Sequence, residues 1–192
     1  MIALPSFREM SFGLYGAWRL ARWDTGAMAW FDATPEGASR SFWAALLCFP
    51  GFIALLALRV SAAEWAQSGG GHILLVESIG YVFGWVAFPL AALYFCRWLN
   101  REDRGFAFVA AYNWFQLVET GLFVIVAALA ATQLLPSRTM DLISALALVA
   151  VLVYEWFIAR IAVGAGGVAA AALVLADLVL GAAVNQVTQG LY

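Results

Sequence analysis

Charged and metal-binding side chains are scarce in this chain of 192 residues. Only 11% of the residues are charged, all ten basic residues are arginine, and the formal net charge is −2. Because such a chain has no basic field, we expect no nucleic-acid partner. The lone histidine, His72, makes a histidine-based metal site or a histidine-dependent catalytic triad improbable.

Motifs of nucleotide-binding and hydrolytic enzymes are absent as well. The sequence has no Walker A loop, no dinucleotide-binding glycine pattern and no HExxH segment. The two cysteines, Cys48 and Cys96, lie in or beside apolar segments, where a free thiol behaves as a small hydrophobic group. We therefore predict a non-enzymatic protein with no catalytic residue, metal or cofactor.

Apolar residues, in contrast, are unusually abundant. They make up 65% of the chain, whereas soluble domains contain about 45–50%. A helix of about 20 apolar residues crosses a bilayer. Stretches of this kind lie at about 39–60, 73–97, 106–135, 141–163 and 166–188, with a short, glycine-ended loop expected at 61–71. The sequence predicts an all-α polytopic membrane protein in which residues 38–192 form a domain of five transmembrane helices.

Residues 1–37 differ from the rest because aromatic and charged residues alternate there. In helical spacing, one face collects Arg8, Tyr15, Arg19 and Arg22, and another Phe7, Met10, Leu14, Trp18 and Ala21. This pattern predicts an N-terminal amphipathic helix that lies along the cytoplasmic membrane surface. One role for this helix is to anchor the chain to the membrane surface. The other is recognition, in which Arg8, Arg19 and Arg22 contact anionic lipid or a partner protein.

Arginine is unequally distributed between the two ends of the predicted spans. One side collects Arg8, Arg19, Arg22, Arg40, Arg97, Arg101, Arg104 and Arg160, and the other has Arg59 and Arg138. Positively charged residues are enriched on the cytoplasmic side. We predict a bacterial-type inner membrane protein with a cytoplasmic N-terminus and the C-terminus on the opposite side, which agrees with an odd number of spans.

Acidic residues within the predicted spans are the main functional cue. In the central span, Tyr112, Asn113, Gln116, Glu119 and Thr120 share one broad helical face. An acid at mid-bilayer costs about 2.5–3.5 kcal/mol on insertion scales, so Glu119 should face other helices. Glu155 and Asp177 fall at a comparable depth, and Asn113, Gln116 and Asn185 are predicted nearby. These side chains either join helices by hydrogen bonds or form a proton, ion or solute pathway.

The start of the central span, Phe108-Val109-Ala110-Ala111-Tyr112-Asn113-Trp114, is similar to the tyrosine-containing entrance of the third span in the Yip1-type membrane family. Together with the five-span plan, it makes residues 39–188 resemble that family. The resemblance implies a non-catalytic membrane protein that acts through partners or bilayer organisation.

Two functions follow as hypotheses. The first is a non-enzymatic accessory or membrane-organising protein, working through membrane lipids and through homo- or hetero-oligomeric contacts with other membrane proteins. The second is a small oligomeric transporter or channel subunit for protons or cations, which would use Glu119, Asp177 and Glu155.

Overall fold

The computed structural model describes residues 5–192, and the regular elements over that range are all helices. They are α1 (Phe7–Ala21), the 3-10 helix η1 (Thr25–Trp30), α2 (Pro35–Ser41), α3 (Trp43–Arg59), α4 (Ala62–Ser68), α5 (Gly70–Trp98), α6 (Glu102–Ala131), α7 (Ser137–Val163) and α8 (Gly167–Gln189). Five segments are long and apolar enough to cross a membrane: α2 with α3, then α5, α6, α7 and α8. The all-α prediction and the number of long apolar helices are confirmed.

The first long segment consists of two helices rather than one. Thr34 caps α2 by accepting a hydrogen bond from the Gly37 backbone N–H, and Pro35 occupies the first turn, where its missing N–H costs nothing. Phe42 separates α2 from α3, and Pro50 lies inside α3. The two helices also differ in composition, because α2 contains Glu36 and Arg40 whereas α3 is apolar up to Arg59.

The predicted loop at 61–71 is wrong in one respect, because it contains the short helix α4. The Ser61 hydroxyl accepts a hydrogen bond from the Glu64 backbone N–H, and the Glu64 carboxylate accepts one from the Ser61 backbone N–H. This reciprocal capping box satisfies donors that would otherwise be exposed at the helix start. The segment between α3 and α5 is thus ordered by local hydrogen bonds.

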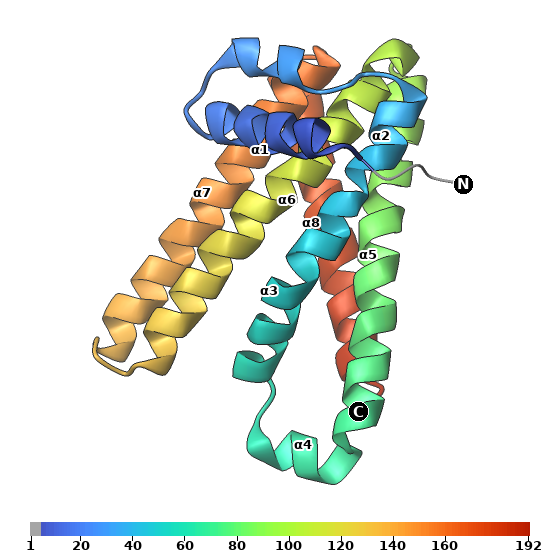
Figure 1. The fold of residues 1–192 in the computed structure, drawn as a ribbon. Coiled ribbons are helices and arrows are strands. Elements are labelled where there is room, and N and C mark those ends of the chain that lie inside the picture. Colours follow the sequence, from blue (N-terminus) through green and yellow to red (C-terminus); the bar gives the residue numbers. More distant parts are fainter. Residues whose placement is uncertain (1–4) are drawn as a thin grey trace.

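Helix α6 is the centre of the bundle and packs against α1, α2, α3, α5 and α7. Helix α8 contacts α5 and α7 instead. The buried core surrounds the first half of α6, where Phe108 and Phe115 are almost fully covered. In the other half, α6 and α7 diverge from α3, α5 and α8 (Figure 1).

Helix α1 lies across one end of the bundle rather than alongside the long helices (Figure 1). Three of its four buried residues, Gly13, Gly16 and Ala17, are small, and Gly13 lies so close to Trp114 of α6 that an added Cβ would overlap the indole ring. The Tyr154 hydroxyl of α7 donates a hydrogen bond to the Ala17 carbonyl. Small residues thus allow α1 to approach both α6 and α7 closely.

Replacing Gly13 by alanine should displace α1. We expect Gly13→Ala to lower the free energy of unfolding by about 1–3 kcal/mol, the usual cost of overpacking, despite the better helix propensity of alanine. Thermal unfolding in detergent, followed by tryptophan fluorescence, measures the change. Gly121→Ala in α6 is the matched control, because an added Cβ there meets no neighbouring atom. Equal stability of the two variants would contradict the packing of Gly13 against Trp114.

Candidate functional site

Three acidic side chains from three helices lie near one another in the middle of the bundle. Glu119 comes from α6, Glu155 from α7 and Asp177 from α8, and the Asp177 charge acts on both glutamates. Among residues 5–192, no arginine or histidine forms an ion pair with any of them. We call these three residues the acidic cluster. They are the three acids that the sequence analysis singled out within the spans.

Two neutral side chains connect the acidic cluster to α6. The Tyr112 hydroxyl donates a hydrogen bond of 2.8 Å to Asp177 Oδ2, and Gln116 Nε2 donates one of 3.0 Å to the Tyr112 oxygen. Phe88 and Phe108 pack around the Tyr112 ring, with centroids 4.6 and 5.9 Å away. This packing fixes the hydroxyl and therefore orients the Asp177 carboxyl group.

Glu155 is the most deeply buried acid of the cluster. It is 2% exposed, and within the described part of the chain its Oε1 atom has no hydrogen-bond partner. An unpaired buried charge is costly in a low-dielectric interior. A carboxyl group placed this way needs a bound proton or an approaching cation to remove the charge. In residues 5–192, no group of acidic, cysteine or histidine side chains is arranged to hold a metal ion.

Asn113 lies apart from the acidic cluster, in contrast to its predicted position nearby. Its Nδ2 atom donates a hydrogen bond of 2.8 Å to the Ser41 hydroxyl, which donates in turn to the Ala38 carbonyl at 2.6 Å. Because adjacent residues of a helix point about 100° apart, Asn113 faces α2 while Tyr112 faces Asp177. Asn113 therefore joins α6 to α2.

Asn185 also belongs elsewhere, about two helical turns beyond Asp177. Arg59 donates hydrogen bonds of 2.5 Å to Asn185 Oδ1 and 2.6 Å to Glu77 Oε1, and the Tyr192 hydroxyl donates one of 2.5 Å to the same Glu77 oxygen. Burial, followed by this hydrogen bond, raises the pKa of Tyr192 to about 12. These hydrogen bonds join α3, α5 and α8.

A cavity of about 810 Å³ lies between these two polar groups. Its walls come from α3, α5, α6, α7 and α8, in the half of the bundle where the helices diverge (Figure 1). Phe123 and Gly181 line its inner part, one helical turn from Glu119 and Asp177 respectively. Arg59 and Glu77 line its outer part. The sequence pattern contained no indication of this cavity.

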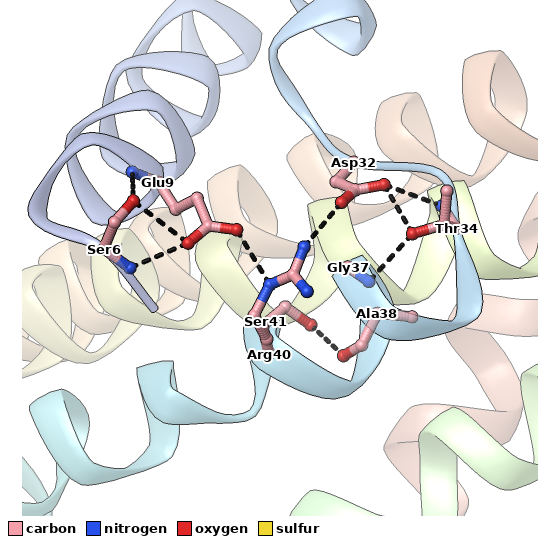
Figure 2. A network of polar contacts seen from close by, with 8 residues as sticks. All are labelled: Ser6, Glu9, Asp32, Thr34, Gly37, Ala38, Arg40 and Ser41. Atoms are coloured by element: carbon pink, nitrogen blue, oxygen red, sulfur yellow. Dashed lines mark hydrogen bonds and ion pairs between the residues drawn. The ribbon is translucent and has the colours of Figure 1, made fainter. Parts of the chain in front are cut away.

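At the opposite end of the bundle, Arg40 connects the N-terminal segment to α2. It forms ion pairs of 2.8 Å with Glu9 and with Asp32 (Figure 2). The Ser6 backbone N–H, and more weakly the Arg40 charge, lower the pKa of Glu9. The Thr34 hydroxyl and backbone N–H, with a smaller effect of Arg40, lower the pKa of Asp32. One cation thus holds two carboxylates from separate segments.

The arginines predicted to contact lipid differ in their environments. Arg8 and Arg22 are exposed and lie over the rings of Phe12 and Trp18, with distances of 5.0 and 4.7 Å to the ring centroids. Arg19 forms an ion pair with Asp24, so its charge is already balanced. Only Arg8 and Arg22 of this set present an unbalanced positive charge at the surface.

No protein-family model, curated protein or solved structure matches this chain. The resemblance to the Yip1-type family therefore stays a prediction.

Acidification should release α1 from α2. The ionised forms of Glu9 and Asp32 are favoured in the folded chain, since their pKa values lie below the ordinary 4.5 and 3.8. Their contribution to stability is therefore complete at neutral pH and is lost as the pH falls below about 4 and through the lowered values. Hydrogen exchange of the α1 amides, corrected for intrinsic rates, should accelerate over this range.

Arg40→Gln should reproduce this loosening at pH 7. Because partly exposed ion pairs contribute up to about 1 kcal/mol each, we expect exchange of the α1 amides to accelerate several-fold. Arg104→Gln is the control, since Arg104 lies exposed in the first turn of α6 and forms its ion pair with Asp103 rather than with Glu9 or Asp32. Unchanged exchange in Arg40→Gln would show that Arg40 does not hold α1.

Proposed function

We propose that this chain is a small proton-coupled transport protein of the membrane, with Glu119, Glu155 and Asp177 as its proton-binding groups. The observation that carries the proposal is the acidic cluster, which lies in the middle of five apolar helices without a basic partner. Intramembrane acids are expensive to insert and commonly lie on proton or ion pathways. This is the second of the two functions that the sequence suggested.

Charge balance supports protons as the bound species. Like charges repel more strongly in an apolar interior than in water, so three carboxylates that act on one another there cannot all remain charged cheaply. A proton neutralises one carboxylate on its own, whereas a metal cation needs several ligand atoms arranged around it. Glu155 supports this view, because its unpartnered Oε1 atom has no donor in the described chain to compensate a negative charge.

The surroundings of the acidic cluster favour a proton pathway over simple helix joining. A hydrogen bond that only joins two helices needs one donor and one acceptor, whereas here Gln116 donates to the Tyr112 hydroxyl, which in turn donates to Asp177. The cavity comes within one helical turn of Glu119 and Asp177. Protons could therefore reach the carboxyl groups from one side through a short rearrangement of Phe123.

The accessory function has separate support in helix α1. Trp18, and Trp23 just after the helix, are about half exposed; Arg22 lies over the Trp18 ring and Arg8 over the Phe12 ring. Aromatic rings beside arginines are typical of helices in the headgroup region of a membrane. We place α1 at the cytoplasmic surface of a bacterial-type inner membrane, as the arginine distribution suggests, with Arg8 and Arg22 against anionic lipid.

Neutralising the acidic cluster should abolish proton movement. In vesicles that contain the purified protein and are given a pH gradient, Glu119→Gln and Asp177→Asn should lower proton flux at least tenfold. Glu36→Gln, which changes an exposed acid at the start of α2, is the control and should retain full flux. Infrared absorption of protonated carboxyl groups should lose intensity in the cluster variants only.

These measurements also separate the two functions. A folded Glu119→Gln variant with full proton flux and unchanged infrared absorption would refute the proton-binding proposal. If the variant unfolds, Gln116→Leu tests the same series of hydrogen bonds without removing an acid, and it should slow proton flux several-fold.

The lipid contact of α1 has its own test. In nanodiscs, the α1 amides should exchange several-fold more slowly when the lipid is anionic than when it is zwitterionic, because Arg8 and Arg22 are attracted to negative headgroups. A chain with both arginines changed to glutamine should lose this difference, and high salt should reduce it in the original protein. Equal protection in the two lipids would argue against this placement of α1.

A further inference from the structure

We propose that the cavity binds a lipophilic organic cation, such as an aromatic phosphonium or quaternary ammonium ion, in exchange for a proton of the acidic cluster. This inference rests on the proposed function and names its substrate class. Size, charge and wall chemistry support it independently of one another.

The size of the cavity suits a small organic molecule. Its volume of about 810 Å³ falls within the range of about 300–1,000 Å³ that is typical of pockets for drug-sized ligands. The walls are mostly apolar side chains, among them Leu55, Leu56, Val126 and Val184. A small hydrated inorganic ion would gain little from such walls, whereas a molecule with a large apolar surface would gain from contact with them.

The charge around the cavity selects a cation. Glu119 and Asp177 each lie one helical turn from a residue that lines its inner part, Phe123 and Gly181 respectively. Arg59 is the one basic residue among the lining residues, and Glu77 balances its charge at 2.6 Å. The net field in the cavity is therefore negative, and in an apolar environment it acts over a longer distance than in water.

Aromatic rings add a second attraction for a cation. Phe52 and Tyr81 line the cavity with ring centroids 4.5 Å apart, and Phe123 faces it from α6. The Tyr81 hydroxyl donates a hydrogen bond of 2.6 Å to the Ala45 carbonyl, which holds the ring in place. A cation over an aromatic face gains about 0.5–2 kcal/mol, more when water is excluded.

Exchange with a proton keeps the total charge of the site constant. When the organic cation enters, one protonated carboxyl group of the acidic cluster releases its proton to water and becomes a carboxylate, and no covalent bond between heavy atoms changes. The other titratable side chains that face these acids are Tyr112 of α6 and Cys48 of α3. One proton leaves for each cation that binds.

Two ions of the same shape and opposite charge provide the test. Tetraphenylphosphonium and tetraphenylborate are added separately to the purified protein in nanodiscs, and binding is followed by equilibrium dialysis, with empty nanodiscs as the blank. We expect tetraphenylphosphonium to bind at least tenfold more tightly than tetraphenylborate. Its binding should weaken at low pH and release about one proton per ion into a weakly buffered solution.

Variants locate the binding site. Phe123→Ala and the pair Glu119→Gln with Asp177→Asn should each weaken phosphonium binding at least tenfold. Leu142→Ala, which changes an exposed residue of α7 outside the cavity lining, should leave it unchanged. If Phe123→Ala unfolds, Gly181→Leu, which adds a side chain to the cavity wall, should block binding instead.

The outcomes separate this inference from the proposed function. Equal or tighter binding of tetraphenylborate overturns the inference, while proton flux through the acidic cluster can still stand. If tetraphenylphosphonium binds preferentially but no proton is released, the exchange with a proton is refuted. If proton flux is absent as well, the proposed function is also refuted. Preferred phosphonium binding with proton release supports both.

Discussion

The acidic side chains in the middle of the bundle that lack a basic partner among the described residues are the constraint on which the rest of the structure depends. Arg40 and Arg59 balance the acids at the two ends of the bundle, whereas Glu119, Glu155 and Asp177 have no arginine within reach in the described chain. Such groups are expensive among apolar helices, so the protein must surround them with neighbours that lower the cost. Helix α6 does so with Tyr112 and Gln116, and it is also the helix that packs against the largest number of other helices.

Hydropathy alone predicted the five long helices, because an apolar length near that of the bilayer needs no knowledge of packing. The expectation of a common depth for the three acids also needs no knowledge of packing, since helical rise depends only on residue number. The partners of Asn113, Asn185 and Arg59 were not predictable. These partners depend on how each helix is rotated about its axis and on which helices are neighbours. The spacing of residues along the sequence gives no information on either.

Two features were overlooked although a local signal was present. Ser61 and Glu64 are three residues apart, as are Ser6 and Glu9, and both pairs match the spacing of a capping box. The first pair would have predicted α4 in place of a loop. The cavity left no such signal, because it results from the divergence of α6 and α7 from the other helices, which no short stretch of sequence encodes (Figure 1).

The close packing of α1 has a consequence for the order of assembly. Tyr154 follows its hydrogen-bond partner Ala17 by 137 residues, and Trp114, against which Gly13 packs, also belongs to a much later helix. During synthesis α1 therefore emerges long before its binding surface exists. It can complete its contacts only after α6 and α7 have been inserted, although it precedes both of them in the chain.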